Sequence, residues 1–110
     1  MNLDLENPFE AVLAKMVETH RAKAKDYAGE DHPNQNFYDS AYQLDLTAGH
    51  SVESLIATKQ ARLRILLPQL WHGGDKPANE GIADTLLDRA VYSVIAMTIW
   101  EDGDYEASGQ

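Results

Sequence analysis

The sequence contains no cysteine and few basic residues, and both absences narrow the possible functions. Without cysteine the chain forms no disulfide bonds, binds no zinc through thiolates and has no thiol nucleophile. Lysine and arginine together number 9 against 18 aspartates and glutamates, which gives a net charge of −9. Because so acidic a chain lacks the positive surface that covers a phosphate backbone, general nucleic-acid binding is not expected.

Long apolar runs and the short motifs of common enzymes are also missing. No run reaches the ~18–20 residues of a membrane span, and no basic stretch followed by an apolar one opens the chain. We therefore expect a soluble cytoplasmic protein with no membrane partner. The sequence has no glycine-rich phosphate loop, no dinucleotide fingerprint, no GxSxG elbow and no HExxH pair.

Apolar residues recur instead at helical spacing, and no segment alternates with the period of a strand. The 110 residues suffice for a single all-α domain, residues 1–110, with an ordered core over about 8–100. The acidic tail 101–110 is expected to be disordered. We predict three long helices and one short one, at residues 8–28, 36–46, 52–67 and 79–100.

Residues with special backbone preferences mark the expected helix ends. Pro8 suits a first helical turn, and Ser51 and Asn79 are suitable N-caps. Gly49 is expected to break the chain before the third helix, and Pro68 to end or kink that helix.

The second half of the last helix, AVYSVIAMTIW, is apolar almost all round. A helix of this kind lies at the centre of a fold or at a subunit interface. We therefore predict a homodimer or higher homo-oligomer that completes a helical bundle through this helix.

Ionisable residues lie in line with the apolar stripes of the helices. The apolar stripe of residues 8–28 is centred on Phe9, Leu13 and Met16. His20, Lys23 and Tyr27 continue this stripe further along the helix. Since buried charge is costly unless it is paired or bound to a ligand, this placement indicates a polar pocket at one end of the bundle.

The other two long helices contribute charges to the same predicted pocket. Lys59 falls inside the apolar stripe of residues 52–67, and Arg62 falls at its edge. Glu80, Asp84 and Asp88 form an i, i+4, i+8 column with steps of about 6 Å. The column leads into the apolar stripe of the last helix, which consists of Val91, Ile95 and Ile99.

A pocket that combines carboxylates, basic side chains and a tyrosine suits a nucleotide ligand. Carboxylates such as Glu80, Asp84 and Asp88 are hard oxygen ligands for Mg²⁺ or Mn²⁺ and would be the catalytic residues of a hydrolase. The cations and His20 would bind phosphates, and Tyr27 would stack on a base. The alternative is a structural network of ion pairs, with acids placed at a helix start by its dipole.

The strings THRAKAKDYAG, NF, KQARL and NEGIADTLLDRAVY resemble small tailed-phage proteins over about residues 10–98. These in turn resemble the MazG-type all-α nucleotide pyrophosphohydrolases and phage nucleotide-modification-associated domains. The resemblance implies a MazG-like bundle, a nucleotide ligand, the host cytoplasm as location and a nucleotide-binding role for Asn36. It rests on His20, Lys23, Asp26, Tyr27, Asn36, Phe37, Lys59, Arg62, Asn79, Glu80, Asp84 and Asp88.

The chain departs from the MazG pattern where that pattern binds metal. The first helix has no ExxE motif, and Asp84 follows Glu80 by four residues where the second motif, ExxD, has three. A pocket that exchanges carboxylates for cations favours phosphate binding over hydrolysis.

Three functions therefore compete. The first is a nucleotide pyrophosphohydrolase or a catalytically weakened nucleotide binder. The second is a phage counter-defence protein that sequesters a host nucleotide second messenger, including a cyclic nucleotide. The third is an acidic inhibitor that binds a protein partner by mimicking nucleic acid.

Overall fold

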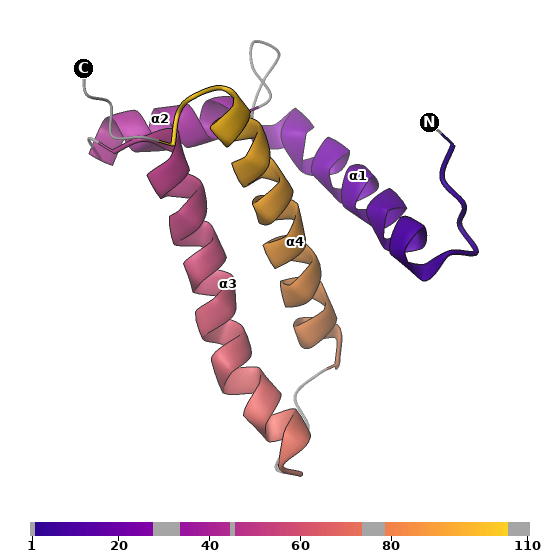
Figure 1. Cartoon of the computed structure of the whole chain (residues 1–110). Coiled ribbons are helices and arrows are strands. Elements are labelled where there is room, and N and C mark those ends of the chain that lie inside the picture. Colours follow the sequence, from indigo (N-terminus) through magenta and orange to yellow (C-terminus); the bar gives the residue numbers. More distant parts are fainter. Residues whose placement is uncertain (1, 28–33, 45, 74–78, 106–110) are drawn as a thin grey trace. The chain divides into compact units, whose positions relative to one another are not determined.

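The computed structural model describes residues 2–27, 34–44, 46–73 and 79–105, and these residues form four helices and no strand (Figure 1). This confirms the all-α class, with three long helices and one short one. Within the same residues no helix is both long enough and apolar enough to cross a bilayer. The helices are α1 (Pro8–Tyr27), α2 (Gln35–Leu44), α3 (Ala48–Trp71) and α4 (Asn79–Glu101).

The chain divides into two compact units, residues 1–36 and 37–110. The first contains α1, which begins at Pro8 as predicted; the side chain of Asn7 accepts a hydrogen bond from the Phe9 N–H at 2.9 Å. No side chain of α1 from Pro8 to Lys23 is fully buried, and that of Phe9 is 72% exposed. The assignment of residues 1–110 to one domain stays a prediction, because it concerns how the two units associate.

The core of the second unit lies between α3 and α4, which run antiparallel to each other (Figure 1). Val52 of α3 and Ile99 of α4 are fully buried. The predicted α4 stripe is confirmed, since Val91 and Ile95 are also buried. From α2, the buried Phe37 ring meets Tyr92 edge to face at 6.4 Å between centroids.

Helix α3 begins four residues earlier than the sequence indicated. Thr47 is the N-cap, and its Oγ1 accepts a hydrogen bond from the His50 N–H at 3.2 Å. The His50 Nδ1 accepts one from the Thr47 N–H at 3.4 Å, which completes a capping box. The prediction of Ser51 as N-cap is wrong; it lies buried inside the helix. Histidine in place of the usual Glu or Gln hid this capping box in the sequence.

Of the two predictions for Pro68, that it ends or kinks the third helix, the first is wrong. Helix α3 continues to Trp71, and the His72 N–H donates to the Pro68 carbonyl oxygen at 2.9 Å. Proline has no N–H to donate within the helix, but the turn beyond Pro68 still closes through the bond from the His72 N–H.

Helix α4 ends in a turn that reverses the chain. Gly103 has a φ of +81°, which favours glycine. Its N–H donates to the Trp100 carbonyl oxygen at 3.0 Å, and the Asp104 N–H donates to that of Ile99 at 3.2 Å. This pair of bonds is a Schellman motif. It directs Asp102–Tyr105, hereafter the C-terminal segment, back towards the start of α3.

The C-terminal segment packs directly on Gly49. The Gly49 N–H donates to the Asp104 carbonyl oxygen at 3.1 Å, and a Cβ at Gly49 would lie 2.8 Å from the Tyr105 Cα. Gly49 therefore permits a close contact inside α3, where the sequence indicated a chain break. The expectation of a disordered tail is corrected for Glu101–Tyr105, while residues 106–110 lie outside the described residues.

This contact predicts opposite effects of the same substitution at two helical glycines. Gly49→Ala should lower the free energy of unfolding by about 1–3 kcal/mol, because the methyl group overlaps the Tyr105 backbone. Gly81→Ala, whose Cβ would meet nothing closer than Arg62 at 3.9 Å, should raise it by about 0.5–1 kcal/mol. Urea unfolding of both variants measures the difference. Equal stabilisation by both would contradict the packing of Tyr105 on Gly49.

Candidate functional site

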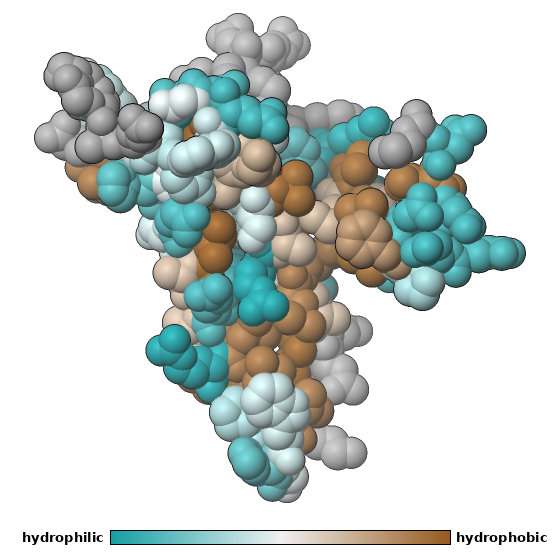
Figure 2. Space-filling view, in the orientation of Figure 1, coloured by the Kyte–Doolittle hydropathy of each residue, from teal (hydrophilic) through white to brown (hydrophobic). Residues whose placement is uncertain are grey.

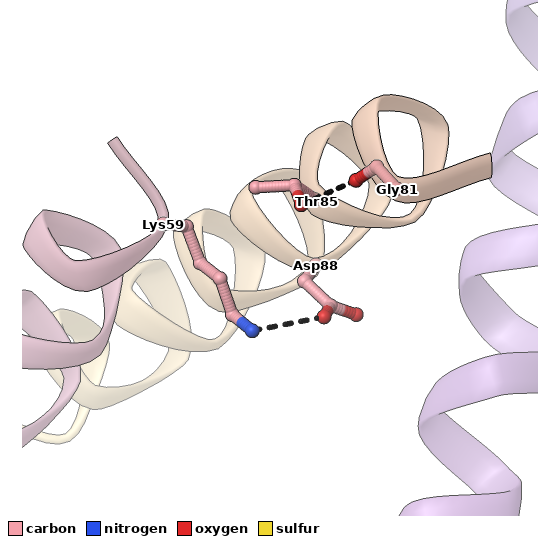
Figure 3. A network of polar contacts seen from close by, with 4 residues as sticks. All are labelled: Lys59, Gly81, Thr85 and Asp88. Carbon is pink, nitrogen blue, oxygen red and sulfur yellow. Dashed lines mark hydrogen bonds and ion pairs between the residues drawn. The ribbon is translucent and has the colours of Figure 1, made fainter. Parts of the chain in front are cut away.

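An ion pair joins the middle of α3 to α4. The Lys59 Nζ lies 3.1 Å from the Asp88 Oδ2, and each side chain is 21% exposed (Figure 3). Lys59 comes seven residues after the buried Val52 and four before the buried Leu63, so it occupies the packed face of α3. The two charges thus lie within the interface between the helices, where each requires the other.

A buried threonine lies three residues before Asp88 on α4. Thr85 is 2% exposed, and its hydroxyl donates to the Gly81 carbonyl oxygen at 2.6 Å (Figure 3). The sequence analysis missed Thr85. Its spacing of three residues from both Ile82 and Asp88 was the signal that it shares their face of the helix.

Arg62 lies beside the first turn of α4. Its Nη2 is 3.9 Å from the point that a Cβ on Gly81 would occupy, although the side chain as a whole is exposed. Lys59 and Arg62 are three residues apart on α3, and both side chains approach α4. The positive end of the α4 helix dipole adds to the charge of Arg62, whereas the charge of Lys59 is balanced by Asp88.

The three acids of the predicted metal column are not equivalent. Asp88 lies in the helix interface, whereas Asp84 is exposed. Each step of four residues rotates the position around the helix by about 40°, so a column of acids turns away from a neighbouring helix. The Glu80 side chain lies outside the described residues.

The predicted Mg²⁺ or Mn²⁺ site stays a prediction. Among the side chains that the structure describes, no three from histidine, aspartate or glutamate are grouped to hold a metal ion. The predicted ligand set includes Glu80, which is not among them.

The remaining predicted site residues belong to the first unit. On α1, His20 is half-buried and Lys23 is exposed, while the Tyr27 side chain lies outside the described residues. Asn36, half-buried in the first turn of α2, is the last residue of that unit. The gathering of these four residues with Lys59 stays a prediction, because it depends on how the two units associate.

A second polar cluster lies where α3 begins. The Tyr38 hydroxyl donates to the Asp104 Oδ2 at 2.6 Å, and the Tyr105 hydroxyl donates to the Glu53 Oε1 at 2.7 Å. The Tyr105 ring also meets Trp100 edge to face, with centroids 5.8 Å apart. The partners in these two bonds are 66 and 52 residues apart, so helical projection had no means of finding them.

Both tyrosines of this cluster stay protonated at neutral pH. Burial, followed by the hydrogen bond to Asp104, raises the pKa of Tyr38 well above its usual value. Burial, followed by the hydrogen bond to Glu53, raises the pKa of Tyr105 to about 12. The two phenols therefore act as hydrogen-bond donors that hold the C-terminal segment, and they are unsuited to act as bases.

Comparison of the chain with models of known protein families, with curated proteins and with solved structures finds no match. The functional argument therefore rests on the cations and acids that α3 and α4 bring together.

Proposed function

We propose that the chain is a nucleotide-handling protein that binds the phosphates of its ligand with Lys59 and Arg62. The observation that supports this most strongly is the position of Lys59, a cation held in the α3–α4 interface by Asp88 at 3.1 Å. The carboxylate fixes the direction of the ammonium group, and Arg62 adds a forked set of donors beside the start of α4. Preorganised cations of this kind suit the phosphates of a nucleotide.

The same ion pair favours binding of an intact nucleotide over its hydrolysis. Asp88 is already neutralised by Lys59, which makes it a poorer ligand for Mg²⁺ than a free carboxylate. Of the acids in the predicted metal column, Asp84 is exposed and remains able to hold a metal ion that arrives with the nucleotide. We therefore place a catalytically weakened binder first.

Sequestration of a host nucleotide signal is the second candidate function, and the same neutralised carboxylate favours it over turnover. It fits the phage setting that the sequence resemblance implies, and it places the protein in the host cytoplasm. In this function Lys59 and Arg62 hold the signal, and the ligand leaves chemically unchanged.

Incubation with a mixed panel of nucleoside triphosphates and cyclic oligonucleotides, with Mg²⁺ and Mn²⁺ present, tests the proposal. After filtration, mass spectrometry identifies the free and the retained species. We expect one intact nucleotide to be retained. Lys59→Ala should weaken its binding at least about tenfold, because a charge-assisted contact is lost. Arg64→Ala, which removes an exposed cation from the same helix, should leave binding unchanged.

Two other outcomes of this experiment would contradict the proposal. Release of monophosphate and pyrophosphate, abolished by Asp84→Asn, would establish hydrolysis and contradict the weakened binder. Absence of both retention and cleavage would contradict a nucleotide ligand altogether.

We also propose that the chain forms a homodimer or higher homo-oligomer through α4. Opposite the face that packs on α3, Leu86, Val94 and Met97 are 41%, 52% and 54% exposed. Their spacing places them on one side of the helix. Figure 2 shows apolar surface along the α3–α4 pair. Exposed apolar faces of this kind are typical of interfaces between subunits.

Val94→Lys should lower the molar mass in solution towards that of one 12.2 kDa chain, because it places a charge in the proposed interface. Size-exclusion chromatography with light scattering measures the mass. Gln60→Lys, at an exposed position of α3, adds the same charge and should leave the mass of the assembly unchanged. A wild-type protein with the mass of a single chain would refute association through α4.

A further inference from the structure

The side of α3 that faces α4 continues beyond the point where α4 begins (Figure 1). Leu70 follows Leu63 by seven residues, or about two turns, so both side chains lie on this side of α3. Leu63 is 2% exposed, whereas Leu70 is 43% exposed. Leu66, which lies between them on the same side, is half-buried. Leu66 and Leu70, hereafter the leucine strip, are therefore only partly covered by the residues that the structure describes.

The leucine strip continues directly from the side chains of the proposed phosphate site. Lys59, Arg62, Leu66 and Leu70 are spaced three, four and four residues apart, which places them along one side of the helix. Each step of four residues advances about 6 Å along the helix axis. One side of α3 thus changes from cationic to apolar within two turns, beside the start of α4.

A ligand that fits both parts of this surface is anionic at one end and apolar at the other. A nucleotide has this composition, because its sugar separates the charged phosphates from a flat base. Two leucine side chains supply far less than the roughly 800 Å² that each partner contributes to a standard protein interface, so the strip suits a single ring system better than a second copy of the chain.

We propose that the leucine strip binds the base of the nucleotide whose phosphates contact Lys59 and Arg62. This inference rests on the proposed function and assigns the nucleotide a second point of contact on α3. Leucine side chains carry no hydrogen-bonding groups, so the contact area of the base sets the strength of this interaction. The strip therefore prefers a purine, which has the larger ring system, to a pyrimidine.

Titration calorimetry of the full chain with ATP, UTP and inorganic tripolyphosphate tests the assignment, because tripolyphosphate has the charge of a nucleotide and no base. We expect ATP to bind more tightly than UTP, and UTP more tightly than tripolyphosphate. Leu70→Ser should weaken the binding of ATP about tenfold and leave that of tripolyphosphate unchanged. Ile65→Ser, which removes an apolar side chain that is 65% exposed on another side of α3, should alter neither.

Tryptophan fluorescence locates the base without a change in the leucine strip. Trp71 directly follows Leu70 and is 68% exposed. The chain has two tryptophans, so Trp100→Phe leaves Trp71 as the single reporter and retains an aromatic ring beside Tyr105. ATP should change the emission of Trp71 at saturation, and tripolyphosphate should change it much less.

Three results would overturn the base site and leave the phosphate site standing. They are equal affinities for ATP and tripolyphosphate, an equal loss of both in Leu70→Ser, and a Trp71 emission that ATP leaves unchanged. A lower molar mass of Leu70→Ser with unaltered ATP affinity would instead assign the strip to contact with a second copy. Binding of none of the three probes would contradict the phosphate site as well.

Discussion

The interface between α3 and α4 has to accommodate two opposite charges, one from each helix. Lys59 and Asp88 meet at 3.1 Å with only a fifth of each side chain exposed. A buried pair of this kind adds little net stability compared with apolar side chains of similar size, although loss of one partner is costly. The pair therefore fixes how the helices align at this level without being needed to hold them together, and this is why we assign it a binding role.

The two ends of the α3–α4 pair differ in chemistry. Towards the start of α3, Val52 and Ile99 are fully buried beside the buried polar residues Thr47 and Ser51, and the C-terminal segment closes this end. Towards the start of α4, Arg62 approaches the first turn of the helix and Thr85 is buried.

Helical periodicity alone predicted the parts of the structure that depend on neighbours three to eight residues apart. It gave the four helices, the buried stripe of α4 and the place of Lys59 within the packed face of α3. It placed Glu80, Asp84 and Asp88 in one straight column, although each step of four residues rotates by about 40° around the helix, and here Asp84 is exposed while Asp88 lies in the helix interface.

Helical periodicity could not predict contacts between residues that are far apart in the chain. Gly49 reads as a helix breaker until Tyr105 is known to lie on it, and the two are 56 residues apart by their numbers. Gly103 does indicate locally that a helix ends in a turn. No nearby residue indicates which part of the chain this turn contacts. The resemblance to MazG-type enzymes supports the choice of a nucleotide as the proposed ligand. The arrangement of the two units stays a prediction.

The central claim is that Lys59, held in place by Asp88, binds the nucleotide and that the ion pair is dispensable for folding. Replacing both together, Lys59→Met with Asp88→Leu, tests it most directly when the free energy of unfolding and the retention of nucleotide are measured on the same protein. We predict that the double variant is as stable as the wild type or more stable, and that it no longer retains nucleotide. A double variant that retains nucleotide as the wild type does, or one that loses several kcal/mol of stability, would contradict the account.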